Sequence, residues 1–441
     1  MKILSDDGAP GNVAAMSGNG SRNGSRNGSP NGSRAPGEAL AAVEWTADAR
    51  AGDERARIAV ERATDEFDRG RAVAIEAAGV VTLAVPAEAW EHGGIANSVE
   101  QGAGAPHGQL TLALSARRAS ALKMRFPAPD TASGELAARV IEDSIVQVNV
   151  PIRDARPLAA LAAGVALGVD GHEAAPAALD RFRAMAVERA GPAAVAAVGL
   201  AKQARLLPCA ILDWPARRNT LDYELAAVRA EDVLRYNALH ARSLKEVARA
   251  RVPLSESEQC LFVLFGVGSA HAKHLAIVVG EPELDKPVPL RLHSACLTGD
   301  VFASLRCDCG SQLRQAVDTI AREGGGVLLY LPQEGRGIGL ANKLRAYRIQ
   351  DTGLDTLDAD ALLGFSPDER EYGAAVSMLE QLGVARVRLL TNNPHKMQAL
   401  AEGGVEVVER LPLIAAVNRH NRPYLEAKAE RAGHMLPMLG D

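Results

Sequence analysis

Residues 327–340, VLLYLPQEGRGIGL, pass from an apolar run of strand-forming residues into a glycine-rich segment and then toward a predicted helix. A strand followed by a helix is the repeating unit of layered α/β proteins. The same alternation extends upstream and continues toward the C-terminus. We expect strands at 261–267, 275–279, 387–390 and 405–408, and helices that begin at Ile338, Asp368 and Pro394. The pattern therefore predicts an α/β domain over residues 246–441.

The composition of the 441-residue chain is typical of a soluble globular protein with two or three domains. The net charge of −5 argues against a protein that binds nucleic acid through its overall charge. No apolar run approaches the roughly 20 residues of a membrane span. Asp6 and Asp7 interrupt the N-terminus before a signal-peptide core can form. We therefore expect neither a nucleic-acid partner nor a membrane partner.

Upstream of residue 246, composition divides the chain into three segments. Residues 1–45 repeat Asn-Gly-Ser four times and predict a disordered tail. Residues 46–220 predict a first domain, and residues 221–245 predict a helical linker. Inside the first domain we expect a helix at 58–69, two strands within 72–85 and mostly helix over 180–206. The predicted fold class is thus α/β (mixed α+β), with two layered α/β domains after the tail.

Three of the five cysteines, Cys296, Cys307 and Cys309, lie within fourteen residues. Five cysteines in so long a chain do not form a disulfide framework, so we expect a reducing cytoplasm. Clustered thiolates suit zinc, and three protein ligands plus a water define a catalytic site. The alternatives are a structural site closed by a distant histidine, or no metal at all. The nearby His293 precedes the cluster in a predicted strand, which favours a packing or substrate-side role over a ligand role.

Two segments that join a predicted strand to a predicted helix have features of anion sites. In residues 333–339, QEGRGIG, glycines allow backbone N–H groups to approach an anion, and Arg336 can bind phosphate oxygens. In residues 391–396, TNNPHK, Asn393 predicts the N-cap of a helix, and Lys396 in its first turn opposes the helix dipole unless an anion binds there. The alternatives are a tight turn for the first segment and a solvent-facing lysine for the second.

Five segments together resemble GTP cyclohydrolase II in order and in spacing. They are 293–300 (HSACLTGD), 304–310 (SLRCDCG), 333–336 (QEGR), 368–370 (DER) and 391–394 (TNNP), within a match over residues 246–435. That family opens the imidazole ring of GTP, releases formate and pyrophosphate, and delivers a diaminopyrimidine ribosyl phosphate to riboflavin biosynthesis. The resemblance also implies magnesium on the triphosphate and a homodimer.

The resemblance implies a role for each matching residue. Cys296, Cys307 and Cys309 are implied to hold one zinc ion per subunit, with Tyr347 beside the reaction, Asp368 as proton acceptor and Arg370 as nucleophile or electrostatic anchor at the α-phosphorus. The positions implied to contact GTP are Arg291, Leu292, His293, Ser294, Ala295, Gln312, Glu334, Gly335, Arg336, Thr356, Thr391 and Lys396. Because the pKa of a guanidinium exceeds about 12, charge stabilisation is the chemically favoured role for Arg370.

Two positions depart from the family pattern. The family commonly has Glu where Ala295 stands and Arg where Pro332 stands. Both positions adjoin segments that are implied to contact the substrate. They leave open the alternative that the chain is a paralogue that acts on another nucleotide. A further alternative is a non-catalytic regulator that binds a nucleotide. Release of formate together with pyrophosphate from GTP distinguishes these possibilities from a GTP cyclohydrolase II.

The first domain resembles dihydroxybutanone phosphate synthase in patches at 56–74, 115–122 and 189–212. That family has an acidic run after its first strand for magnesium and sugar phosphate, and a catalytic His after Arg-Ala-Gly. This chain has EAAGVV at 76–81 and Pro192 at the histidine position. Magnesium requires hard oxygen ligands, so we expect no synthase activity. A role in dimerisation, scaffolding or regulation of the second domain stays open.

Overall fold

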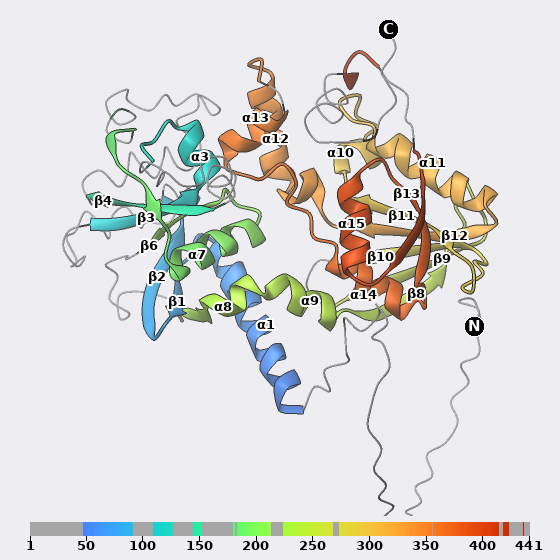
Figure 1. Cartoon of the computed structure of the whole chain (residues 1–441), viewed down its shortest axis with the longest axis horizontal. Helices are drawn as coiled ribbons and strands as arrows, with labels where there is room; N and C mark the ends of the chain where they lie inside the picture. Colours follow the sequence, from blue (N-terminus) through green and yellow to red (C-terminus); the bar gives the residue numbers. More distant parts are fainter. Residues whose placement is uncertain are drawn as a thin grey trace, which may run out of the picture.

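The computed structural model describes residues 47–90, 109–126, 144–151, 180, 183–212, 224–267, 273–354, 356–413, 418–422 and 435. The predicted disordered tail, residues 1–45, lies outside the described residues. Figure 1 shows two sheets side by side, each covered by helices. Each sheet has seven strands, which confirms the predicted class of two layered α/β domains. Within the described part of the chain, no helix combines the length and the apolar character that a membrane span requires.

The first sheet has the strand order β5-β4-β3-β6-β2-β1-β7. Its strands are β1 (Val73–Ala77), β2 (Val80–Pro86), β3 (Gln109–Ser115), β4 (Ile145–Pro151), β5 (Glu188–Arg189), β6 (Cys209–Leu212) and β7 (Ala226–Arg229). Neighbouring strands are antiparallel except for β1 and β7, which are parallel. The two strands expected within 72–85 are confirmed as the β1–β2 hairpin, which turns at Ala78 and Gly79 with positive φ angles.

The helices of the first domain bury small apolar side chains against its sheet. They are α1 (Ala47–Asp68), η1 (Ala87–Trp90), α3 (Ala116–Ala121) and α7 (Pro192–Gln203). Pro192 occupies the first turn of α7, where its missing N–H leaves no hydrogen bond unmade. The α7 alanines and Leu200 pack with Val60, Phe67 and Ile75 in one of the two cores of this domain.

The predicted helical linker at 221–245 requires correction. Its described part contains β7, α8 (Ala230–Leu234) and α9 (Tyr236–Ser243). Strand β7 belongs to the first sheet, because Val228 pairs with Ile75 of β1 and is buried in that core. The first domain thus extends past residue 220. Periodicity missed β7 because four residues are too few to separate a strand from a helical turn.

The second sheet has the order β14-β13-β11-β12-β10-β9-β8. Its strands are β8 (Lys245–Arg251), β9 (Cys260–Gly266), β10 (His274–Gly280), β11 (Val288–Ser294), β12 (Gly325–Leu331), β13 (Arg386–Leu390) and β14 (Glu406–Leu411). Strands β14, β13, β11 and β12 are parallel to one another, whereas β10, β9 and β8 continue the sheet as antiparallel neighbours. The strands predicted at 261–267, 275–279, 387–390 and 405–408 are therefore confirmed within a few residues.

Helices cover both faces of the second sheet (Figure 1). The described helices of the second domain are α10 (Leu297–Asp300), α11 (Cys309–Arg322), η5 (Glu334–Gly337), α12 (Leu340–Gln350), α13 (Thr356–Leu363), α14 (Gly373–Gln381) and α15 (Pro394–Glu402). Helix α11 buries Ala316, Val317 and Ile320 against one face, and α14 buries Met378 and Leu379 against the other. The helix expected from Asp368 is wrong in its start, because α14 begins at Gly373 and leaves Asp368 in the preceding loop.

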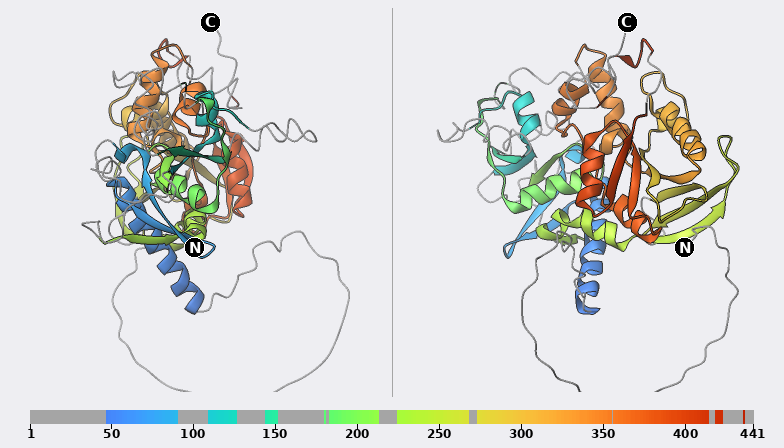
Figure 2. Two further views of the ribbon diagram at one scale, coloured as in Figure 1. Left: turned by 90° about the vertical axis from the view of Figure 1, so that its left-hand side faces the viewer. Right: turned by 45° about the vertical axis from the view of Figure 1, so that its right-hand side comes forward.

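The two domains meet along α12 and α13, which lie between the sheets in Figures 1 and 2. Leu207 of the first domain is buried in a cluster with Ile338, Ile349, Leu363 and Phe365 of the second. The buried Arg118 guanidinium, from α3, donates a hydrogen bond to the carbonyl oxygen of Leu362. The contact between the domains therefore combines an apolar core with polar anchors.

Candidate active site

The candidate site lies where the parallel strands β13, β11 and β12 end. Each of these strands runs directly into a segment singled out in the sequence: residues 391–396 after β13, residues 295–300 after β11 and residues 333–339 after β12. The carboxyl ends of neighbouring parallel strands open onto the same edge of a sheet, where α/β proteins commonly bind ligands. The topology thus brings together three segments that are distant in sequence.

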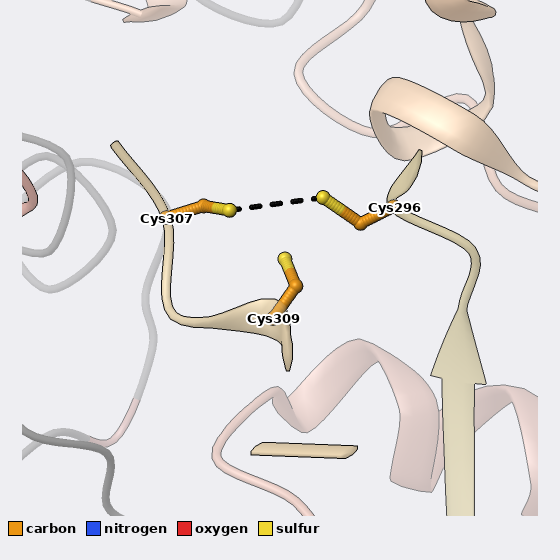
Figure 3. Close-up of side chains that lie close together, drawn as sticks. All are labelled: Cys296, Cys307 and Cys309. Atoms are coloured by element: carbon orange, nitrogen blue, oxygen red, sulfur yellow. Dashed lines mark hydrogen bonds between the residues drawn. The ribbon is translucent and has the colours of Figure 1, made fainter. Parts of the chain in front are cut away.

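The three cysteines form a triangle of sulfur atoms. Their Sγ atoms all lie within 4.8 Å of one another, and Sγ of Cys296 is 3.7 Å from Sγ of Cys307. Figure 3 shows the three side chains pointing toward a common centre. A Cβ atom added at Gly299 would lie 2.8 Å from Sγ of Cys307 and 3.1 Å from Sγ of Cys296. Only glycine at 299 leaves the sulfur triangle its space.

Asp300 holds the segment that carries Cys296. Its carboxylate accepts hydrogen bonds from the Cys296 N–H at 2.9 Å and from the Tyr330 hydroxyl at 2.9 Å, and lies 3.1 Å from Nε2 of His293. The His293 ring stacks on Tyr330 with 5.5 Å between centroids. Burial lowers the pKa of His293, partly offset by Asp300. His293 therefore has the packing and pocket-side position expected of it and does not join the sulfur cluster.

Lys343 of α12 reaches the sulfur cluster, and the sequence analysis missed it. Its Nζ lies 3.1 Å from Sγ of Cys296, 2.8 Å from Oγ1 of Thr298 and 2.8 Å from Oε1 of Glu334. Burial lowers the pKa of Lys343, but Glu334 and Cys296 raise it more, so the net pKa lies above its usual value. Hydrogen bonds from the Cys307 and Cys309 thiols, with Lys343 nearby, hold the pKa of Cys296 well below its usual value.

The glycine-rich segment after β12 adopts a left-handed turn. Gly335 and Arg336 have φ angles of 62° and 59°, and Gly337 follows with a φ of 98°. The turn directs the Arg336 guanidinium toward the carbonyl oxygen of Pro367 at 3.3 Å and Oδ2 of Asp360 at 3.6 Å. Burial raises the pKa of Asp360 to about 7, although the charge of Arg336 lowers it.

Asp368 and Arg370 form a two-point ion pair beside the glycine-rich turn. Nε and Nη2 of Arg370 lie 2.7 Å and 2.5 Å from the two carboxylate oxygens of Asp368. Burial raises the pKa of Asp368, but the hydrogen bonds and charge of Arg370 outweigh it and the net pKa lies below the usual value. The pair is joined to the turn because the Glu369 N–H donates to the Arg336 carbonyl oxygen at 3.1 Å.

The segment after β13 has the cap that its sequence predicts. The Asn393 side chain accepts a hydrogen bond from the His395 N–H at 2.9 Å, and Pro394 opens α15. Lys396 is buried, and its Nζ donates to the Leu292 carbonyl oxygen at 2.7 Å. Lys396 therefore does not point into solvent. The N–H of Asn393 donates to Oγ1 of Thr391 at 3.0 Å, which fixes this hydroxyl at the pocket wall.

One pocket collects most of the residues that the sequence analysis proposed. It is lined by Arg291, His293, Ser294, Ala295, Cys296, Cys307, Cys309, Gln312, Glu334, Gly335, Arg336, Tyr347, Arg370, Thr391 and Lys396. Leu292 and Asp368 do not line it, although each bonds to a residue that does. Thr356 begins α13.

The pocket is rich in cationic side chains. Arg291, Arg336, Lys343, Arg370 and Lys396 face it from different elements. Lys343 and Asp360 could not be found by motif, because neither lies in a segment with a local pattern. Their positions depend on how α12 and α13 pack beside the strand ends. A site of this kind suits a polyanionic ligand next to a thiolate cluster.

The fold and the pocket together define a class of protein: an α/β enzyme scaffold that presents three cysteines and several cations at the ends of parallel strands. The sequence model of one family, described as GTP cyclohydrolase II, matches residues 245–412. A curated GTP cyclohydrolase-2 of Azospirillum brasilense is 47% identical over 391 residues, which covers 87% of this chain and 95% of the relative. This chain belongs to the GTP cyclohydrolase II family.

Two further relatives match less than half of this chain, in contrast to the Azospirillum relative. A GTP cyclohydrolase-2 of Azotobacter vinelandii is 51% identical over 183 residues, which covers 40% of this chain and 88% of the relative. A protein named riboflavin biosynthesis protein RibBA, of Chlorobium phaeovibrioides, is 44% identical over 214 residues, covering 48% of this chain and 52% of that protein. The Azospirillum relative therefore shares both domains of this chain, whereas the Azotobacter protein is about as long as one of them.

Proposed function

We propose that this chain hydrolyses GTP as a zinc-dependent GTP cyclohydrolase II, opening the imidazole ring and releasing formate and pyrophosphate at the start of riboflavin biosynthesis. The observation that carries this proposal is the convergence of the sulfur triangle with Arg336, Arg370 and Lys396 in one pocket. We also expect magnesium with the triphosphate. The homodimer and the cytoplasmic location stay predictions.

The cysteine triangle fits a zinc ion. A Zn–S distance of about 2.3 Å and tetrahedral angles require sulfur atoms about 3.8 Å apart, and the Cys296–Cys307 separation is 3.7 Å. The space left by Gly299 supports the same donor set. When bound, zinc supplies a water whose pKa is lowered toward neutrality and polarises the group that this water attacks.

The cationic side chains are suited to bind and orient the triphosphate. Arg336 projects from a turn whose glycines permit close approach, and a guanidinium can pair with two phosphate oxygens at once. Lys396 stands in the first turn of α15, where an anion gains from both the ammonium and the helix dipole. Held in this way, a nucleotide has its phosphates fixed while its base is directed at the sulfur cluster.

Asp368, Arg370 and Tyr347 are the residues suited to act on the reacting groups. With a lowered pKa, Asp368 is a carboxylate at neutral pH and can accept a proton while it orients Arg370. Arg370 is suited to stabilise charge at the α-phosphorus. Two cations lie over the Tyr347 ring, with Arg306 at 5.1 Å and Nζ of Lys343 at 5.8 Å from its centroid. These contacts fix the ring at the pocket wall beside the cysteines.

We further propose that the first domain lacks dihydroxybutanone phosphate synthase activity. In the hairpin at 76–81, Glu76 is the only carboxylate and is exposed on β1. Pro192 opens α7 at the position where the synthase family has a catalytic histidine. One exposed carboxylate does not supply the set of oxygen ligands that magnesium requires.

The test is to incubate the purified full-length protein with GTP, magnesium and zinc and to measure formate and pyrophosphate together. Both products in equal amounts support the proposal. Pyrophosphate without formate would refute ring opening, and neither product with zinc bound would favour the paralogue or the regulator. Ribulose 5-phosphate serves as the substrate in a parallel assay, and its conversion to dihydroxybutanone phosphate would refute the second proposal.

A further inference from the structure

The end of α7, in the first domain, contacts two loops of the candidate active site. Lys202 Nζ lies 2.7 Å from Oε1 of Glu369, the residue between Asp368 and Arg370. Three residues further along, the Arg205 guanidinium donates a hydrogen bond to the carbonyl oxygen of Gly337, which follows Arg336. Neither Lys202 nor Arg205 is among the residues that line the pocket. The first domain thus holds residues that are adjacent to those facing the ligand.

The two loops are in direct contact with each other. The N–H of Glu369 donates to the carbonyl oxygen of Arg336 at 3.1 Å. A Cβ atom at Gly337 would lie 2.7 Å from the Glu369 carbonyl oxygen, so the backbones are in direct contact. Oε1 of Glu369 also accepts from the Ser366 N–H at 2.7 Å. These contacts connect Glu369 and Gly337, the residues that Lys202 and Arg205 bond to, with the backbone of the loops that carry Arg336 and Arg370.

Arg205 occupies a backbone position that favours glycine. Its φ angle is 60°, and it follows the end of α7 in a Schellman arrangement, with its N–H on the Lys202 carbonyl oxygen and the Leu206 N–H on the Ala201 carbonyl oxygen. A side chain in this left-handed conformation is disfavoured. The arginine is nevertheless present, and its guanidinium crosses to Gly337. Strain of this kind at a non-glycine residue points to a use for the side chain.

The second domain is shaped to receive Arg205. A Cβ atom at Gly339 would lie 2.9 Å from Cβ of Arg205, so glycine there makes room for it. The fully buried Asn342 donates from Nδ2 to the Arg205 carbonyl oxygen at 2.8 Å and to the Ile338 carbonyl oxygen at 3.0 Å. Arg205 therefore contacts the second domain at three points: its guanidinium bonds to Gly337, its Cβ lies against Gly339, and its carbonyl oxygen accepts from Asn342 of α12.

We propose that Lys202 and Arg205 are positioning residues for the GTP site: they hold the 334–337 turn and the 366–370 loop so that Arg336 and Arg370 face the ligand. The first domain then serves as a structural part of the cyclohydrolase site. The inference rests on the proposed function only for its activity readout. The contacts themselves are independent of the reaction.

The decisive variant is Arg205→Gly. Glycine accepts the positive φ angle without strain, and this relief offsets much of the cost of losing the hydrogen bond to Gly337, so the melting temperature should change by no more than a few degrees. Loss of the guanidinium should lower kcat on GTP by about 10- to 100-fold, the range seen when residues that orient active-site groups are removed. Zinc content should be unchanged. Unchanged kcat, or a kcat that falls only in step with the melting temperature, would overturn the proposal.

Lys202 is tested by two substitutions with a matched control. Lys202→Met should lower kcat more than it raises KM for GTP, and Lys202→Arg, which keeps the charge near Glu369, should recover most of the activity. The control is Arg69→Met, which removes an exposed ion pair, 3.6 Å from Glu66, in the same domain. Equal effects of Lys202→Met and Arg69→Met, or no recovery in Lys202→Arg, would contradict a positioning role.

Hydrogen–deuterium exchange tests the positioning role of Arg205 without relying on activity toward GTP. The amides of Gly337 and Glu369 donate to the Gln333 and Arg336 carbonyl oxygens in the structure. They should exchange faster in full-length Arg205→Gly than in the wild type, with or without turnover. A wild type that releases no formate would refute the cyclohydrolase, whereas unchanged exchange in the variant would refute the positioning role.

Discussion

The turn of the β1–β2 hairpin in the first domain follows a strand of a seven-stranded sheet. So does the segment of the second domain that runs from the end of β11 to the first residue of α11. The hairpin has one exposed carboxylate, Glu76, and Val80 is 64% exposed. In the other segment, Cys296, Cys307 and Cys309 converge, and their three sulfur atoms lie within 4.8 Å of one another. The comparison indicates that a seven-stranded sheet does not by itself make a site of this kind. Convergent side chains at the strand ends do so.

The largest expected effect is from Cys307→Ser, which removes one corner of the sulfur triangle. A hydroxyl is a much poorer zinc ligand than a thiolate, so zinc should be lost and formate release abolished. Metal analysis and a formate assay check this.

The matched control for that variant is Cys260→Ser. Cys260 is buried, whereas Cys307 is half-buried; Cys260 lies on β9 and its thiol donates to the Ser257 carbonyl oxygen at 3.3 Å. A serine hydroxyl can make the same bond, so zinc and activity should stay. Full zinc content and full activity in Cys307→Ser would contradict the assignment of Cys307 as a zinc ligand.

The next largest effect is expected for Arg370→Ala. Removing one charge-stabilising donor from an active site costs about 10²–10³-fold in kcat. Both formate and pyrophosphate release should fall together, because Arg370 is proposed to act at the α-phosphorus. A stopped assay for both products measures this, with Arg306→Ala, whose guanidinium lies over the Tyr347 ring, as a milder comparison. Normal release of either product would show that Arg370 has another role.

A smaller effect on stability follows from Asp360, whose pKa is raised to about 7 by burial. Between pH 4 and 7 the folded state binds more protons at this carboxyl than the unfolded state does, so its contribution to stability falls as the pH rises. Asp360→Asn removes this dependence. We expect the melting temperature of the variant, relative to wild type, to rise by a few degrees from pH 5 to pH 8. A difference that stays constant over this range would contradict the raised pKa.

The smallest effect is expected in the hairpin. Val80→Ser should change stability by no more than about 0.5 kcal/mol, because the side chain is exposed and makes no buried contact. Activity on GTP should be unchanged. If formate release drops severalfold in Val80→Ser, the hairpin has a function that its chemistry does not indicate, and the contrast between the two regions fails.

Much of the second domain was predictable because its signals are local. Apolar runs marked β9, β10, β12 and β13, and the Asn393-Pro394 pair marked the start of α15. The glycine-rich segment likewise indicated the turn that carries Arg336. The start of α14 was misplaced because an acidic residue such as Asp368 favours a helix start, yet here it pairs with Arg370 in the preceding loop.

Periodicity and spacing, which act over a few residues, were enough to predict the class of the fold and the cysteine cluster from the sequence, and the resemblance to a known family implied most of the residues that face the pocket. Only the tertiary structure decided that Lys343 contacts Cys296, that Asp360 lies behind Arg336, and that Arg205 of the first domain holds Gly337 of the second. Residues 205 and 337 are brought together by the packing of two domains, and no local pattern encodes such a contact.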